Sequence, residues 1–165
     1  MVHIIYGILQ TKVDIIKGGI EMDKLKLKGI WIIQRIRNGK VLDEEIIENT
    51  IVADGKERVA KLLNGIETTS FKYLAIGTGT TSPTTSDTSL ESEDQRALAS
   101  TSYESAGKSV LEKTFSFTSS KTITEAGSFD SGTVSGSTML NRATFTGKAV
   151  DATTSLYVKC TITLS

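Results

Sequence analysis

The chain has 165 residues, the usual size of one domain, and its 19 basic and 19 acidic side chains give a formal net charge of zero. A neutral chain lacks the excess basic charge by which proteins bind nucleic-acid phosphates or anionic membranes, so we expect neither as a partner. The single cysteine, Cys160, cannot form an internal disulfide. The single histidine, His3, excludes a His-rich metal site and a pair of catalytic histidines.

The first 21 residues follow neither a helical nor a strand period. Lys17-Gly18-Gly19-Ile20-Glu21-Met22 can be encoded by a purine-rich stretch just before an ATG codon, as in a translated prokaryotic ribosome-binding site. We therefore expect Met22 to be the natural start, with residues 1–21 a non-native or disordered extension. The alternative is a genuine N-terminal strand or arm.

The composition changes along the chain. Residues 1–67 contain two Ser or Thr residues, whereas residues 68–165 contain 39. Hydroxyl and β-branched side chains suit strands that are buried on one face only. We expect residues 22–165 to form one β-rich domain, with a hairpin over 24–52, a helix over 54–64 and a sandwich over 71–165.

Asn38-Gly39 predicts a tight turn in a hairpin over residues 24–52. The turn predicts the cross-strand pairs Arg37 with Lys40, Ile36 with Val41, Gln34 with Asp43, Ile32 with Glu45, Ile30 with Ile47, and Trp31 opposite Ile46 on the other face. The first strand is basic and the second is acidic. We interpret the acids Asp43, Glu44, Glu45 and Glu48 as a solvated strand face rather than a cation site, because successive side chains of a strand point to opposite sides.

One amphipathic helix is predicted over residues 54–64. Asp54 is placed to cap it, Asn64-Gly65 is placed to end it, and Val59, Leu62, Leu63 and Ile66 form its apolar side. We expect this helix to pack against one end or side of the sheets.

The remaining chain alternates strands with turns. Strands are predicted at 71–76, 96–104, 110–118, 122–129, 138–146 and 155–164, with turns at 106–107, 119–120, 130–137 and 147–154. In the last strand, Leu156, Val158, Cys160, Ile162 and Leu164 share one face. With the hairpin, about eight strands predict a mainly β fold: an antiparallel β-sandwich or jelly-roll-like barrel.

Two groups of residues could suggest ligand sites. Gly77-Thr78-Gly79 lacks the Gly-Lys-Ser/Thr of a phosphate-binding loop, so a turn that ends a strand is preferred. Glu91, Glu93 and Asp94 could bind a hard cation, but they lack the spacing of a calcium-binding loop.

Three further side chains could suggest catalysis. Glu125 and Asp130 could be paired glycosidase carboxylates, yet isolated acids near turns are usually solvated or bonded to backbone amides. Cys160 is interpreted as a buried apolar residue rather than a nucleophile. We predict no catalytic, cofactor-binding or metal-binding residues, no cofactor and no enzymatic activity.

Several short motifs occur in an order that resembles a known group. These are residues 49–56 (NTIVADGK), 73–83 (YLAIGTGTTSP), 86–93 (SDTSLESE), 123–130 (ITEAGSFD), 137–145 (STMLNRATF) and the final strand 155–165. They resemble small virion structural proteins of tailed bacteriophages and related archaeal viruses or proviruses, often called tail-fibre-like or phage structural proteins. Cys160 stands where that group has Trp.

The resemblance implies a structural protein of the virion, present in multiple copies in the tail, neck or head surface and made in the host cytoplasm. Its partners would be copies of itself and other virion proteins, with the hairpin 24–52 either embracing a neighbour or forming part of the same sheet. The alternative is a cell-surface or secreted adhesin-like β-domain that binds carbohydrate. That class would carry an export signal and exposed aromatic side chains.

Overall fold

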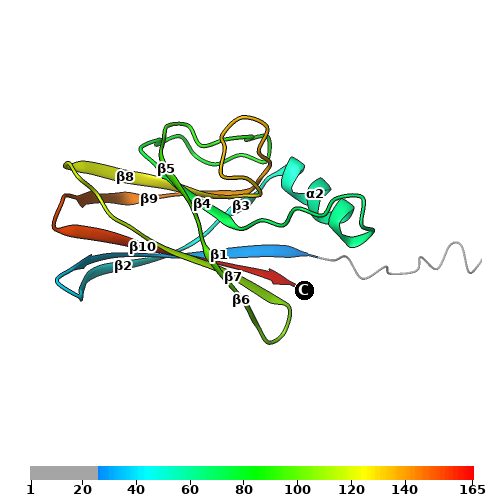
Figure 1. The fold of residues 1–165 in the computed structure, drawn as a ribbon, viewed down its shortest axis with the longest axis horizontal. Helices are drawn as coiled ribbons and strands as arrows, with labels where there is room; N and C mark the ends of the chain where they lie inside the picture. The colour runs from blue at the N-terminus through cyan, green and yellow to red at the C-terminus, as the bar shows by residue number, and fades with distance from the viewer. Residues whose placement is uncertain (1–25) are drawn as a thin grey trace, which may run out of the picture.

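The computed structural model describes residues 26–165, so the expectation for residues 1–21 lies outside the described part of the chain. Two antiparallel five-stranded sheets pack face to face (Figure 1). In spatial order, sheet A comprises β2 (Lys40–Glu48), β1 (Leu27–Arg37), β10 (Thr154–Leu164), β7 (Lys108–Phe115) and β6 (Ser100–Glu104). Sheet B comprises β3 (Thr50–Ile51), β9 (Met139–Val150), β8 (Lys121–Phe129), β4 (Tyr73–Gly77) and β5 (Glu93–Leu98). The mainly β prediction is confirmed, as a sandwich and not a closed barrel.

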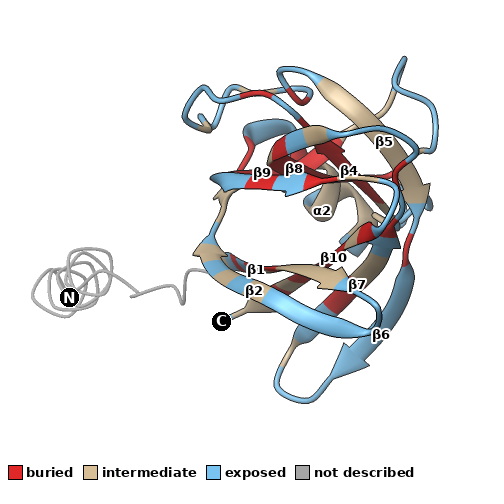
Figure 2. Ribbon diagram, turned by 90° about the vertical axis from the view of Figure 1, so that its left-hand side faces the viewer, coloured by how far each residue is buried: buried red, intermediate tan, exposed pale blue. Residues whose placement is uncertain are grey.

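The core lies between the two sheets, where Figure 2 shows the buried segments of both. Trp31 and Ile33 of β1 are fully buried there, opposite Cys160 and Val158 of β10. The alternation predicted for the last strand is confirmed from Leu156 to Ile162, since every second residue is buried. Because β1 supplies Trp31 to this core, the hairpin is part of the sheet and not a detachable arm.

The hairpin turns at Asn38-Gly39 as predicted, and both residues have positive φ. The predicted pairing holds for Arg37 with Lys40 and Ile36 with Val41, and then fails. A β-bulge at Leu42 shifts the register by one residue, so Arg35 faces Asp43 and Ile32 faces Ile46. Arg35 and Asp43 form an ion pair in this register.

The segment predicted as a single strand over 96–104 is two strands in different sheets. β5 ends at Leu98 in sheet B, and β6 begins at Ser100 in sheet A. Ala99 lies between them, is buried, and donates its N–H to the carbonyl of Lys72 (2.9 Å). A small residue at this corner lets the chain cross between the sheets, and residues 26–165 contain ten strands instead of eight.

The turn predicted at 147–154 begins later. β9 continues to Val150, which is buried, and the connection to β10 is limited to residues 151–153. The carboxylate of Asp151 accepts the N–H (2.8 Å) and the hydroxyl (2.7 Å) of Thr153 in this turn. Lys148 keeps the extended β9 in place by pairing with acids of β2.

Helix α2 (Ala53–Leu63) begins and ends one residue earlier than predicted, and Asp54 does not cap it. Its closest approach to sheet B is at Gly55, where a Cβ atom would lie 2.6 Å from the carbonyl oxygen of Leu140. Val59 packs against the core, but Leu63 and Ile66 are about 70% exposed (72% and 71%). The helix therefore covers one end of the sandwich with only part of its apolar side.

We predict that Trp31→Ala lowers the free energy of unfolding by about 3–5 kcal/mol, because it empties a large volume in the centre of the core. Urea denaturation followed by circular dichroism measures this change. Ile46→Ala, at a side chain that is 62% exposed, is the matched control and should cost well under half as much. Equal losses for the two variants would contradict the assignment of β1 to the core.

Candidate functional site

An ion pair lies on the outer face of sheet B. Ala126 of β8 and Ala143 of β9 belong to the core between the sheets, so their neighbours Glu125 and Arg142 face the other way. The Nε and Nη2 atoms of Arg142 each lie 2.9 Å from Oε2 of Glu125. Glu125 is 0% exposed and Arg142 is 2% exposed, so both charges are removed from water.

Glu125 also binds both ends of the loop 78–92. Its Oε1 accepts the N–H groups of Gly79 (2.9 Å) and Ser92 (2.8 Å), and its Oε2 accepts the N–H of Glu91 (3.0 Å). A Cβ atom on Gly79 would lie 2.5 Å from Oε1 of Glu125, so glycine allows the loop to approach this closely. With five donors around it, the carboxylate has no free position for acid–base chemistry.

Arg142 binds the middle of the same loop. It donates to Asp87 (2.8 Å) and to the hydroxyl of Thr81 (3.3 Å), and it lies 3.7 Å from Glu91. Burial alone would raise the pKa of Asp87, but hydrogen bonds from Thr84 and Arg142 outweigh it and hold that pKa below 3.8. The backbone N–H of Thr81 is the main cause of the lowered pKa of Glu91.

A second arginine holds the loop 130–138. The guanidinium of Arg96 lies 3.7 Å from the centre of the Phe129 ring and donates to the carbonyls of Ser131 (3.0 Å) and Thr133 (3.1 Å). It also pairs with Glu93 (2.7 Å). The loops 78–92 and 130–138 are thus fixed by arginines on the outer side of sheet B, where a small second core of Val52, Ala75, Leu90, Phe129 and Met139 is buried.

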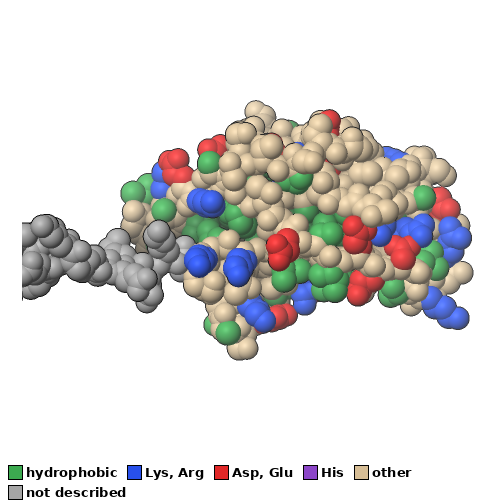
Figure 3. All heavy atoms as spheres, turned by 180° about the vertical axis from the view of Figure 1, so that it is seen from behind, with side chains coloured by type: hydrophobic (Ala, Val, Ile, Leu, Met, Phe, Trp, Pro, Cys, Tyr) green, Lys and Arg blue, Asp and Glu red, His purple; other side chains and the backbone are tan. Residues whose placement is uncertain are grey.

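The outer face of sheet A is open to solvent. Ile32 of β1 pairs with Ile46 of β2 on this face, beside Ile30, which is 46% exposed. Both edge strands are also exposed: β2 presents Val41 and Leu42 (53% and 48%), and all five residues of β6 are exposed, Tyr103 by 75%. Figure 3 shows apolar side chains interspersed with acidic and basic ones on one side of the molecule. We call the outer face of sheet A, with its edge strands β2 and β6, the bare face.

Polar side chains brace the part of the bare face that lies over β10, β7 and β6. Tyr157 donates its hydroxyl to Glu112, and Lys159 pairs with Glu104 (3.2 Å). Burial and the bond to Glu112 raise the pKa of Tyr157 to about 12, so this hydroxyl stays protonated. These pairs order the face without covering β1 and β2.

The acidic residues of β2 divide between the two faces of the strand. Glu44 and Glu48 are exposed, as predicted. The prediction of a solvated face is wrong for Asp43 and Glu45, which point toward sheet B and pair with Lys148 (3.3 and 2.9 Å). The ion pair with Arg35 is the main cause of the lowered pKa of Asp43.

The structure separates the acids that could have formed a cation site. Glu91 binds loop amides, Glu93 pairs with Arg96, and Asp94 pairs with Lys121. In the part of the chain that the structure describes, no group of three His, Cys, Asp or Glu side chains is placed to hold a metal ion. Gly77-Thr78-Gly79 ends β4 as predicted.

Glu125 and Asp130 are engaged by different loops. Asp130 accepts the N–H of Thr138 (2.8 Å) and pairs with Arg58 (3.1 Å), while Glu125 binds the other loop. We predicted that these acids are either solvated or bonded to backbone amides. Both are buried and bonded to backbone amides. Cys160 is fully buried, as predicted, and burial raises the pKa of its thiol to about 12.

The sequence prediction missed Arg142 and Arg96. Arg142 is a charged residue in a strand of mostly apolar or small residues, whereas Arg96 lies in the polar strand β5 (EDQRAL). Alternation assigns both positions to the outer face of sheet B. The signal that could have revealed Arg142 is its pairing with an equally isolated Glu125 in the preceding strand. Neither position indicates by itself that a loop covers it.

No model of a protein family, no curated protein and no solved structure matches this chain. Among residues 26–165, no helix has the length and apolar character needed to cross a bilayer.

We predict that Glu125→Ala lowers the free energy of unfolding by about 3–5 kcal/mol, because it removes the fully buried partner of Arg142 and the acceptor of three loop amides. It should also free the loop 78–92, which hydrogen–deuterium exchange would detect as faster uptake at Gly79, Glu91 and Ser92. Glu44→Ala, at an exposed acid of β2, is the control. Unchanged uptake in the loop of Glu125→Ala would contradict this role of Glu125.

Acid should release the same loop. The pKa values of Asp87 and Glu91 lie below their ordinary values of 3.8 and 4.5, so their stabilisation is complete above those values and is lost as the pH falls through the lower folded values. Amide exchange at Thr80 and Thr81, followed by NMR and corrected for intrinsic rates, should accelerate below about pH 4. Asp87→Asn should weaken this pH dependence, and an unchanged profile would contradict it.

Proposed function

We propose that this chain is a structural subunit of a virus particle, of the kind found in tailed bacteriophages and related archaeal viruses, and that it assembles in multiple copies. The observation that carries the proposal is the contrast between the two sheets. Sheet B is covered by two fixed loops, whereas the described residues 26–165 leave sheet A with a partly apolar open face and two edge strands that pair on one side only.

Free sheet edges normally carry devices that prevent association, such as proline, bulges or inward charges. β6 contains neither a proline nor a bulge, and its residues Ser100–Glu104 are all exposed. β2 has one bulge, yet it presents Val41, Leu42 and Ile46 to solvent. A subunit that buries these groups against neighbours gains total binding strength through repetition, even where each contact is modest.

The order of motifs over residues 49–165 supports the viral assignment, because it resembles small virion structural proteins. The buried charged side chains of sheet B are also consistent with a structural role. Among the buried charges of the described residues, Glu125 and Arg142 are the least exposed, and both hold a loop on sheet B, which is a structural role.

We predict that the purified full chain forms oligomers whose population rises with concentration, and that Ile46→Lys shifts them toward monomer. A lysine there adds charge to the centre of the apolar part of the bare face and to an edge strand. Sedimentation velocity and negative-stain electron microscopy measure the change.

Val134→Lys is the matched control, since Val134 is 60% exposed and lies in the loop 130–138, on the covered sheet. It should assemble like the parent chain. A parent chain that remains monomeric at all concentrations, or equal behaviour of the two variants, would argue against assembly through the bare face.

A further inference from the structure

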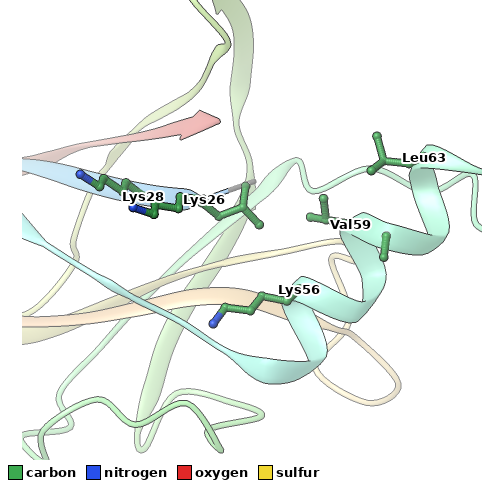
Figure 4. Close-up of a pocket in the computed structure, with 7 residues that line it drawn as sticks. Lys26, Lys28, Lys56, Val59 and Leu63 are labelled. Carbon is green, nitrogen blue, oxygen red and sulfur yellow. The ribbon is translucent and has the colours of Figure 1, made fainter. Parts of the chain in front are cut away.

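A groove lies between the beginning of β1 and helix α2, at one end of the sandwich. It has a volume of about 540 Å³ and is lined by Leu27 of the strand and by Val59, Ala60 and Leu63 of the helix. Figure 4 shows Val59 and Leu63 on the helix side and Lys26 and Lys28 on the strand side. A second hollow of about 400 Å³ adjoins it and shares Leu27, Lys28 and Lys56.

The strand edge facing this groove has unused hydrogen-bonding groups. Lys26 and Ser165 exchange two backbone hydrogen bonds (2.6 and 3.0 Å), and antiparallel pairs alternate. Leu27 therefore directs its N–H and C=O away from β10, toward the side that β2 leaves open when it ends at Glu48. Residues 26–165 provide no backbone partner for these two groups, and on the same edge the only such bond beyond Glu48 runs from the N–H of Asn49 to the carbonyl of Gly29 (3.2 Å).

The charges around the groove have one sign. Lys26, Lys28 and Lys56 surround it, and none of the three has an ion-pair partner in the described range 26–165. The single acid in either lining is Glu48, at the far hollow. An occupant that carries carboxylates is therefore favoured.

Asn49 adds a polar group to the second hollow. Its side-chain nitrogen and oxygen are both shielded from solvent without a hydrogen-bond partner. They lie against Gly29, where a Cβ atom would be only 2.2 Å from Nδ2 of Asn49. A buried amide without partners is costly, so the Asn49 side chain would gain by turning outward into the hollow, where a peptide backbone has the N–H and C=O groups that would satisfy it.

We propose that this groove binds an extended peptide segment of a partner protein, in which apolar and acidic residues alternate, by adding it as a strand to the free edge of β1. The backbone of the segment would bond to Leu27, its apolar side chains would lie against Val59 and Leu63, and its carboxylates would meet the three lysines. Strand addition between a sheet edge and a helix uses main-chain bonds for affinity and pockets for selectivity. This inference goes beyond the proposed function, because the groove lies beside helix α2 at the end of β1, beyond the paired strands β1 and β2 that carry Ile32 and Ile46.

The test is an NMR titration of the full chain with the blocked peptide acetyl-Asp-Ile-Asp-Val-Asp-Ile-amide. The amide signals of Leu27, Gly29 and Ala60 should shift in a saturable way, and exchange of the Leu27 amide should slow as it gains a partner. The matched peptide with Lys in place of Asp should bind at least roughly tenfold more weakly.

Two variants separate the charge effect from any effect on folding. The double variant Lys28→Glu, Lys56→Glu should weaken binding of the acidic peptide roughly tenfold and improve binding of the basic one. Lys40→Glu is the control, since Lys40 is exposed at the opposite end of β1 and should leave both affinities unchanged. All of these lysines are exposed, so the variants should fold.

Four results would overturn the proposal. They are the absence of saturable shifts at about 1 mM peptide, equal binding of the two peptides, shifts centred outside the groove, and a Leu27 amide that is already protected before any peptide is added. Protection that is independent of protein concentration would mean that the chain fills its own groove. Protection that rises with concentration would assign the groove to a second copy. Failure of the peptide to bind would leave assembly through the bare face unaffected, so the two proposals fail separately.

Discussion

Glu125 and Arg142 form an ion pair from which water is almost wholly excluded, and much of the molecule is arranged around that exclusion. Two charges buried on the outer face of a sheet are costly unless further hydrogen bonds complete their shells. Here those bonds come from both ends and the middle of the loop 78–92. The pair and the loop therefore require one another: the loop shields the charges, and the charges hold the loop on the sheet.

Because the buried ion pair holds a loop on sheet B, the outer faces of the two sheets differ in how far loops cover them. Loops held by Arg142 and Arg96 give sheet B a second small core and leave little of its outer face available. Within residues 26–165, sheet A has no comparable loop, and side-chain pairs such as Lys159 with Glu104 brace its outer face. Loops thus cover the outer face of sheet B, whereas the outer face of sheet A keeps exposed apolar side chains. This arrangement is expected of a subunit that buries its apolar surface against neighbouring subunits.

The sequence predicts best those features that depend on neighbours in the chain. Alternation identified the inward face of β10, and Asn38-Gly39 located the hairpin turn, because both effects are local. The bulge at Leu42 was missed, since it depends on Asp43 reaching Arg35 and on Lys148 arriving from the other sheet. The crossing at Ala99 was missed for a similar reason: residues 96–104 contain no Gly or Pro that would divide them into two strands, and the sheet that each half joins depends on distant partners.

Sequence was equally unable to predict the contacts between distant segments that form the candidate sites. Glu125 and Asp130 were predicted to be solvated or bonded to backbone amides, and both bind amides. Sequence could not pair Glu125 with Arg142 through a loop that begins nearly fifty residues earlier in the chain. The groove beside β1 was also invisible, because it exists only where β2 turns away at Glu48 and helix α2 comes to lie opposite. Interactions that join distant segments set both features.

The direction of the strands limits how copies could meet through sheet A. β2, β10 and β6 run parallel to one another, because each is separated from the next by one antiparallel neighbour. A twofold contact between two β2 strands would bring Glu44 and Glu48 of each copy close to those of the other, and like charges facing across strands are destabilising. A contact from β2 of one copy to β6 of the next avoids that repulsion, since β6 has a single acid among hydroxyl side chains and Tyr103. Such a contact joins two different surfaces, so its repetition generates a ring or a filament instead of a closed pair.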